Sequence, residues 1–349
     1  MDFKAFISGC AGTKLSDEER RLFAAARPCG FILFRRNCET PEQIKSLIAS
    51  FKDCVESDAA LVMIDQEGGR VQRLRPPHWR NMPPARCYGR LYVTDPELAK
   101  RAAFAGARLI AQELHGLGIN VNTMPVLDVP EQGAHEIIGD RAYSENPDIV
   151  IALGRAVIEG CLAGGVLPVI KHVPGHGRAK ADSHLTLPRI DADPDMLDAT
   201  DFRTFRALRD APLAMTAHVL MPAFDERRPA STSPVIMGEV IRKRIGLTGL
   251  VMSDDVGMKA LRGPFGARAR DVIGAGCDVA LHCSGDLAEM REVAEAVPPL
   301  KDVAAERFAR ARGLLTEPQP YDLNESLALV TEAAATQIAT LGPDPTVQA

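Results

Sequence analysis

The sequence has little that would attract nucleic acid or build a disulfide framework. Its 349 residues carry a formal net charge of −5 and contain no long basic run, which makes nucleic acid a poor candidate partner. The eight cysteines are thinly spread, and no two of them form a C-x-x-C pair. Scattered thiols are typical of a reducing compartment rather than of a disulfide-linked domain or a zinc ribbon.

Long hydrophobic runs are also lacking. No segment reaches the ~18 consecutive apolar residues of a membrane-spanning helix. ISGC at residues 7–10 looks like a lipoprotein cleavage box, but no apolar stretch of ~7–15 residues precedes it. We therefore expect a cytoplasmic protein without membrane attachment. Since 46% of the residues are apolar, the chain can bury a sizeable core.

Short apolar segments recur along most of the chain, and several are bounded by glycine. Continuous apolar runs of this kind fit strands that are buried on both faces, as in a parallel sheet. Eight runs are found, at residues 4–8, 30–34, 61–65, 119–126, 166–172, 213–219, 249–255 and 279–283.

Helix start signals lie between these runs. Ser16, Thr40 and Thr94 each stand three residues before an acidic or amide side chain, and Pro41 and Pro147 stand near expected helix starts. Strands and helices that alternate eight times predict an α/β protein with a single-domain (β/α)8 barrel. A doubly wound open sheet is the alternative, although no G-x-G-x-x-G follows the first strand.

The chain after the barrel has a different character. We expect the barrel to occupy residues 1–316, and residues 317–349 to form a C-terminal helix and a frayed tail. No linker divides the chain into two domains. A monomer or a weak dimer is expected.

Polar residues cluster where the predicted strands end, which is where barrel enzymes place their chemistry. Each one taken alone could be a solvated charge or a helix cap, but a buried charge is costly without a partner or ligand. These residues are Asp65, Glu67, Arg70, Arg73, Asp128, Asp140, Arg141, Lys171, His172, His218, Ser253, Asp254 and Asp255.

The segment KHVPGHGRAKADSH at residues 171–184 holds three of the eight histidines. A helical metal site is disfavoured, because Pro174 and the nearby glycines prevent His172 and His176 from sharing a helix face. An amidohydrolase-like metal barrel stays open as an alternative, although the H-x-H pair expected after its first strand is missing. No phosphate-binding P-loop is present.

Asp182 and His184 lie two residues apart in this segment. A carboxylate at that spacing can bind one imidazole nitrogen, raise its basicity and leave the other nitrogen free to move a proton. A satisfied loop histidine is the simpler reading for an isolated D-x-H. The strand-end carboxylate Asp254 and the nearby basic side chains favour the catalytic interpretation.

Five motifs together resemble the β-N-acetylhexosaminidases of glycoside hydrolase family 3, in the short bacterial form that takes part in peptidoglycan recycling. They appear in the family's order over most of the chain. Small departures are Val173, which replaces a usual aromatic residue, and the ending of the last motif. The motifs are DQEGGRVQR (65–73), GDRAYS (139–144), KHVPGHG…ADSH (171–184), RPASTSP (228–234) and SDDVGM (253–258).

The resemblance implies a retaining glycosidase that needs no cofactor or metal. It implies that Asp254 is the nucleophile and that His184, oriented by Asp182, is the acid/base. His176 is expected to hold the loop, and the role of Asp255 stays open. The substrate-binding positions implied by the family are Asp65, Arg73, Arg141, Lys171 and His172.

The resemblance also implies a substrate. This is a muropeptide, from which the enzyme removes terminal β-linked N-acetylglucosamine that precedes 1,6-anhydro-N-acetylmuramic acid. A β-glucosidase on the same scaffold and a silent sugar-binding barrel are the alternatives that remain.

Overall fold

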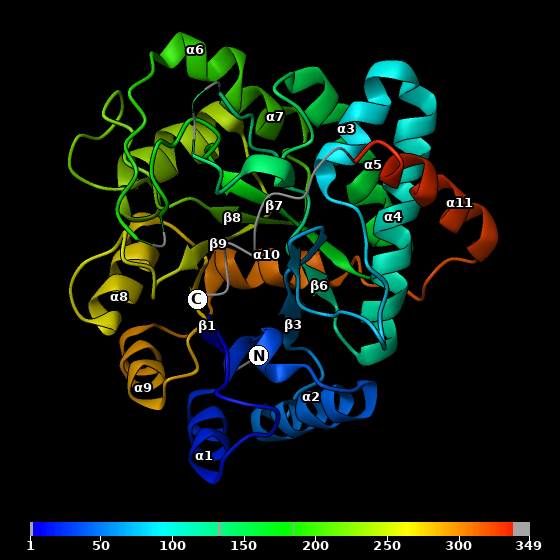
Figure 1. The fold of residues 1–349 in the computed structure, drawn as a ribbon. Helices are drawn as coiled ribbons and strands as arrows, with labels where there is room; N and C mark the ends of the chain where they lie inside the picture. The colour runs from blue at the N-terminus through cyan, green and yellow to red at the C-terminus, as the bar shows by residue number, and fades with distance from the viewer. Residues whose placement is uncertain (1–2, 132, 134, 184, 338–349) are drawn as a thin grey trace.

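Eight parallel strands form a closed barrel with helices around it (Figure 1). The computed structural model describes residues 3–131, 133, 135–183 and 185–337. Around the barrel the strands follow the order β1-β10-β9-β8-β7-β6-β3-β2, and every neighbouring pair is parallel. The predicted (β/α)8 fold is confirmed, and the open-sheet alternative is wrong. The barrel strands are β1 (Lys4–Ser8), β2 (Pro28–Leu33), β3 (Leu61–Ile64), β6 (Val121–Asn122), β7 (Leu167–Val173), β8 (Leu213–Thr216), β9 (Leu250–Asp255) and β10 (Val279–His282).

Helices connect the strands and pack on the outside of the barrel (Figure 1). The α-helices are α1 (Asp17–Ala26), α2 (Pro41–Val55), α3 (Ala85–Thr94), α4 (Pro96–Leu117), α5 (Pro147–Ala163), α6 (Pro194–Ala199), α7 (Asp201–Ala207), α8 (Phe265–Ala275), α9 (Leu287–Ala296), α10 (Asp302–Arg312) and α11 (Leu323–Ala334). Short 3₁₀ helices are η1 (Arg35–Asn37), η2 (Gly139–Arg141) and η3 (Ala230–Thr232), and η4 (Ile236–Ile245) is a π-helix. None of the described helices has the length and apolar character needed to cross a membrane.

The strands are largely apolar because both of their faces are covered. All four residues of β3 are buried, as are all six of β2. One face of such a strand fills the barrel interior, and the other lies under a helix. Phe31 of β2 stacks on Phe51 of α2 with 4.6 Å between ring centroids, and Phe23 of α1 meets both rings edge-on.

Two of the three predicted helix caps are confirmed. The Ser16 side chain accepts a hydrogen bond from the Glu19 amide, and Thr40 accepts one from the Gln43 amide. The expectation for Thr94 was wrong, because Thr94 is the last residue of α3 and Asp95 caps α4. Since proline suits the first helical position, Pro96 makes the preceding carboxylate the capping group.

The fourth barrel strand is much shorter than expected. The prediction covered residues 119–126, whereas β6 contains only Val121 and Asn122. Pro125 lies within the predicted run and has no amide hydrogen to donate to a ladder. The segment still follows β7, because the Pro125 carbonyl accepts from the Lys171 amide at 3.2 Å.

The two ends of the barrel differ. At the amino ends of the strands Phe3 packs edge-on against Phe308 of α10, with 5.9 Å between the ring centroids. The carboxyl ends carry the polar side chains described below. Beside the barrel, α11 packs on α4 (Figure 1), and the buried Arg108 of α4 lies over the Tyr321 ring at 4.3 Å. Residues 338–349 of the predicted tail lie outside the described residues.

One outer helix directly touches the segment that follows η2. A Cβ atom at Gly89 of α3 would lie 1.7 Å from the carbonyl oxygen of Tyr143. No side chain fits in that space, so only glycine lets α3 approach so closely. Tyr143 follows Arg141 by two residues, so this contact also bears on the polar end of the barrel.

We expect Gly89→Ala to destabilise the protein by about 1–3 kcal/mol or more, because the added methyl group overpacks the contact with Tyr143. Gly116→Ala on α4 is the matched control, since nothing lies within 4 Å of a Cβ there. It should be neutral or stabilise the protein by up to about 1 kcal/mol. Urea unfolding followed by circular dichroism measures both changes. Equal stability of the two variants would contradict the prediction.

Candidate active site

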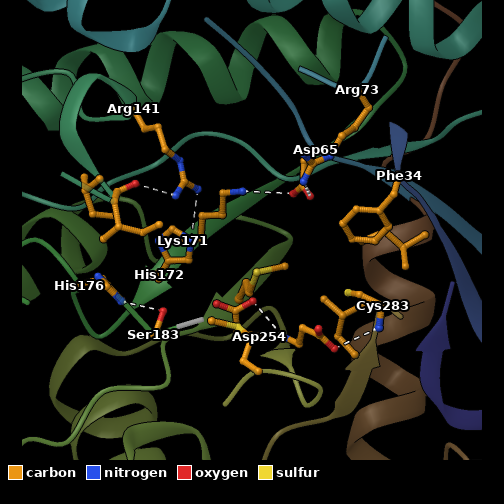
Figure 2. Close-up of a pocket in the computed structure, with 17 residues that line it drawn as sticks. Phe34, Asp65, Arg73, Arg141, Lys171, His172, His176, Ser183, Asp254 and Cys283 are labelled. Atoms are coloured by element: carbon orange, nitrogen blue, oxygen red, sulfur yellow. Dashed lines mark hydrogen bonds and ion pairs between the residues drawn. The ribbon is translucent and has the colours of Figure 1, made fainter. Parts of the chain in front are cut away.

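A cavity opens at the carboxyl ends of the barrel strands, with a volume of about 570 Å³ that includes its open mouth (Figure 2). Polar side chains line one part of it and apolar ones the rest. The lining residues are Ile32, Phe34, Asp65, Arg73, Ile137, Ile138, Arg141, Lys171, His172, His176, Ser183, Met215, Asp254, Asp255, Met258, Leu281 and Cys283.

The cavity brings together six of the eight residues that the sequence singled out. These six are Asp65, Arg73, Arg141, Lys171, His172 and Asp254. Asp182 is half-buried in the loop after β7, next to the cavity-lining Ser183. His184 lies outside the described residues.

Asp65, directly after β3, is bound by two cations. Its Oδ2 atom accepts from Arg73 at 2.8 Å, its Oδ1 atom lies 3.3 Å from Lys171 Nζ, and the Thr123 hydroxyl also donates to Oδ1. Burial alone would raise the pKa of Asp65, but Lys171 and Arg73 outweigh it and hold that pKa well below its ordinary value. The carboxylate is therefore ionised at any physiological pH and acts only as an acceptor.

Glu67 is a central residue of the site to which sequence reasoning assigned no role. Arg141 binds both of its carboxylate oxygens, at 2.9 and 2.8 Å, and Lys171 Nζ lies 2.6 Å from Oε1. Burial opposes ionisation, yet these two cations lower the pKa of Glu67 to about 2. A signal was available, because Asp65 and Glu67 are two residues apart and side chains at that spacing share one side of an extended chain.

A tight hairpin presents these carboxylates. It consists of β4 (Gln66–Gly68) and β5 (Val71–Gln72), which pair antiparallel outside the barrel. Gly68 has φ of 100°, and a Cβ there would lie 2.5 Å from the Pro83 carbonyl oxygen. The two glycines of the EGGR turn thus let the chain reverse against a neighbouring segment.

His172 is oriented by the buried Asp128, whose side chain has no exposed surface. His172 Nδ1 lies 2.7 Å from Asp128 Oδ2, and Nε2 lies 3.5 Å from Arg141. Since arginine can only donate, this arrangement favours a ring that donates from Nδ1 and accepts at Nε2. Burial would raise the pKa of Asp128, but His172 more than offsets it, so the carboxylate has a lowered pKa.

The two consecutive aspartates of β9 have different surroundings. Asp254 is half-buried and lines the cavity, and its Oδ1 atom accepts from the Asp255 amide. Asp255 is buried, and its Oδ1 atom accepts from the amides of Gly257 at 2.9 Å and Cys283 at 3.1 Å. Burial raises the pKa of Asp255. These bonds give Asp255 a structural part, since they join the end of β9 to the end of β10.

His176, near the start of the loop after β7, links that part of the loop to Ser183 further along it. Its amide donates to Asp128 at 2.7 Å, and its Nε2 atom lies 3.2 Å from the Ser183 hydroxyl. Burial and the adjacent His172 lower the pKa of His176 to about 4, so the ring is neutral at neutral pH. These contacts are consistent with the loop-holding role that the sequence suggested for it.

Lys171, His218 and Asp254 are the residues that could imitate the rest of an amidohydrolase-like metal site, and they are engaged separately. Lys171 binds Asp65 and Glu67, while the fully buried His218 contacts the Asp255 carbonyl and the Ser231 hydroxyl, at 2.9 and 2.6 Å. Among the residues that the structure describes, no three histidine, cysteine or acidic side chains are grouped so as to hold a metal ion.

The cavity therefore combines ionised acceptors, fixed cationic donors and apolar surface. Asp65 pairs with Arg73 and Lys171, and Glu67 pairs with Lys171 and Arg141. Phe34 lies beside Asp65 and Arg73 (Figure 2), and the Arg73 guanidinium lies 5.0 Å from the centre of its ring. Hydroxyl groups of a small ligand can both donate to and accept from such a set. The exposed part of Asp254 faces the same space (Figure 2), which puts a carboxylate, a group that can serve as a nucleophile, at the wall of the cavity.

Solved structures of a related enzyme share this fold. NagZ from Neisseria gonorrhoeae is 29% identical, with a TM-score of 0.84 over 96% of this chain and 98% of that one. The same enzyme has been solved in complex with N-trifluoroacetyl-D-glucosamine, and that structure has the same identity and TM-score.

Sequence comparisons agree with the structural ones. The chain is 40% identical to a β-hexosaminidase of Alkalilimnicola ehrlichii over 80% of each chain. It is 37% identical to one of Aromatoleum aromaticum over 89% of this chain and 87% of the other. Residues 5–313 match the family model described as the glycosyl hydrolase family 3 N-terminal domain, and this chain therefore belongs to glycosyl hydrolase family 3.

Proposed function

We propose that this protein is a retaining β-N-acetylhexosaminidase that removes terminal β-linked N-acetylglucosamine from peptidoglycan fragments. The family supports a glycosidase, and the related β-hexosaminidases support the reaction. The relative solved with N-trifluoroacetyl-D-glucosamine supports the sugar. The observation that carries most weight is Asp254, a half-buried carboxylate that faces a cavity lined by fixed polar groups.

Asp254 acts as the nucleophile in this proposal. Its carboxylate attacks the anomeric carbon, the glycosidic bond breaks, and a covalent glycosyl-enzyme forms. His184, oriented by Asp182, protonates the departing oxygen and then removes a proton from the water that releases the sugar. His184 lies outside the described residues, so its role rests on the family resemblance. Ser183, the residue before it, lines the cavity.

The ion-paired side chains bind the sugar. Asp65 accepts hydrogen bonds from hydroxyl groups, and His172, oriented by Asp128 through its Nδ1 atom, lines the same cavity. Arg73, Lys171 and Arg141 donate to hydroxyl oxygens. Because their partners already hold these side chains in place, little side-chain entropy is lost when the sugar binds.

The natural substrate that we propose is N-acetylglucosamine linked to 1,6-anhydro-N-acetylmuramic acid peptides, hydrolysed in the cytoplasm during cell wall recycling. We propose that a monomer or weak dimer is sufficient for this reaction, without a cofactor or metal.

The substrate class can be tested with synthetic muropeptides and nitrophenyl sugars. We expect turnover of the muropeptide and of nitrophenyl β-N-acetylglucosaminide, with much slower hydrolysis of nitrophenyl β-glucoside. Treatment with a chelator should leave these rates unchanged. Faster hydrolysis of the glucoside would instead make the protein a β-glucosidase, and binding without turnover would make it a silent sugar-binding barrel.

The nucleophile can be identified by trapping the glycosyl-enzyme with a fluorinated sugar that slows its hydrolysis. Peptide mapping by mass spectrometry should place the added sugar on Asp254. Asp254→Asn should not be labelled, whereas a folded Asp255→Asn variant should still be labelled, because the two side chains have separate surroundings. A sugar attached to any other residue would overturn the assignment.

Glu67 should stabilise the site in a pH-dependent way. Glu67→Gln leaves the buried Arg141 without its carboxylate partner and leaves Lys171 with Asp65 alone. We expect it to lower the free energy of unfolding by about 3–5 kcal/mol at pH 7. The folded-state pKa is lowered from 4.5 to about 2, so this contribution is present above pH 4.5 and is lost as the pH falls toward 2. Urea unfolding across this pH range should show the difference from wild type shrinking.

Glu145→Gln is the matched control for this measurement. Glu145 also pairs with an arginine, Arg86 at 2.6 Å, but its side chain is 64% exposed. Its loss should therefore cost less than about 1 kcal/mol. If Glu67→Gln were no more destabilising than this control at pH 7, the buried ion pairs would not stabilise the site.

A further inference from the structure

The loop after β7 is held at its base by Arg178, a residue with no assigned role in the proposed reaction. Each guanidinium nitrogen binds a different residue: Nε donates to Asp201 at 2.7 Å, Nη1 to Glu131 at 2.8 Å and Nη2 to Thr200 at 2.9 Å. The side chain of Asp201 is fully buried, and that of Arg178 is only 10% exposed. Arg178 thus fixes the loop to the start of α7 and to the segment near residue 131.

Close packing holds the same part of the loop. A Cβ at Gly177 would lie 2.1 Å from the Val129 carbonyl oxygen, so the two backbones are in direct contact. The Gly177 carbonyl accepts from the Glu131 amide, and the Ala179 carbonyl accepts from the His135 amide. Gly177 therefore allows the loop backbone to pack directly against the backbone at Val129. Residues 174–179 form the fixed first part of the loop.

The far end of the loop is anchored as well. The Ile190 amide donates to the Leu220 carbonyl, and the Leu220 amide donates to the Pro188 carbonyl, at 2.9 and 2.8 Å. Between the two anchors lies the span 180–187, in which the Asp182 carbonyl accepts two amide hydrogen bonds from within the span itself. Asp182, which is proposed to orient the acid/base, therefore lies in a short segment that is fixed to the rest of the protein at both ends.

We propose that Arg178 is a positioning residue for Asp182 and Ser183, the described part of the proposed acid/base segment. This inference rests on the proposed function, because it assumes that the segment supplies the acid and the base. Asp182 follows Arg178 by only four residues, so a displaced base shifts the segment relative to the sugar. Proton transfer depends steeply on distance, and a misplacement of ~1 Å can cost ~100-fold in rate.

The test compares Arg178→Gln with Arg189→Gln. Arg189 lies on the same loop and also pairs with an aspartate, Asp191 at 2.8 Å, but its side chain is 53% exposed. We expect Arg178→Gln to lower kcat by ~10- to 100-fold on an aryl N-acetylglucosaminide with a poor leaving group. The loss should be much smaller for the glycosidic-bond cleavage step, measured as kcat/KM, when the substrate has a good leaving group. That step then needs little protonation of the departing oxygen. Arg189→Gln should match wild type on both substrates.

Added azide separates positioning from general damage. Azide attacks the anomeric carbon of the glycosyl-enzyme, forms the glycosyl azide and releases the Asp254 carboxylate without any proton transfer. With a good leaving group, azide should therefore raise the turnover of Arg178→Gln and leave that of Arg189→Gln unchanged. A loss of activity in Arg178→Gln that is the same on both substrates and insensitive to azide would overturn the positioning role.

His184→Ala, measured alongside, separates this inference from the proposed function. If His184→Ala lacks the leaving-group dependence and the azide response, the acid/base assignment itself fails. If it has both and Arg178→Gln has neither, only the positioning role fails.

Should Arg178→Gln not fold, Glu131→Gln combined with Thr200→Val removes two contacts of Arg178 and keeps its pair with Asp201. This double variant must then lose less kcat than expected for Arg178→Gln, and azide must raise its turnover. Wild-type kcat with no response to azide would overturn the proposal.

Discussion

The ion pairs that Lys171 makes with Asp65 and Glu67 are the interaction on which the site depends. Removing charges from water is costly, and the cost is offset here because each charged group has partners at hydrogen-bonding distance. The chain of contacts runs from Arg73 through Lys171 to Arg141, and so crosses from the hairpin after β3 to β7 and η2. It fixes the spacing of these elements at the open end of the barrel, where a sugar must find its donors and acceptors already in place.

Much of the fold follows from local patterns in the chain. Apolar runs such as residues 61–64 are buried on both sides, which only a covered parallel sheet provides, and six of the eight predicted strands have nearly their expected extent. The strand predicted at residues 213–219 ends earlier, at Thr216. The fourth strand was overestimated, because hydrophobicity does not register the amide that Pro125 lacks. Asp95 replaced Thr94 as a cap, because the choice between adjacent capping residues depends on where the next helix starts.

The site was predictable in its membership but not in its connections. Asp65, Lys171 and Asp254 could be chosen because polar residues after buried strands are costly without a purpose. The link from Glu67 to Arg141 spans 74 positions in the sequence and depends on a hairpin that reverses at two glycines. Asp128 is similar, since its partner His172 is 44 residues away and nothing in the local pattern marks the pair.

The contact between Gly89 and Tyr143 has a consequence for how this protein can change over time. The outer helix α3 touches the backbone two residues beyond Arg141, so the outer surface and this cavity-lining group are not independent targets of selection. A larger side chain on α3, acquired by drift or introduced by an engineer, would push on that backbone and so alter ligand affinity. Libraries aimed at this helix should therefore be screened for catalysis as well as for heat resistance.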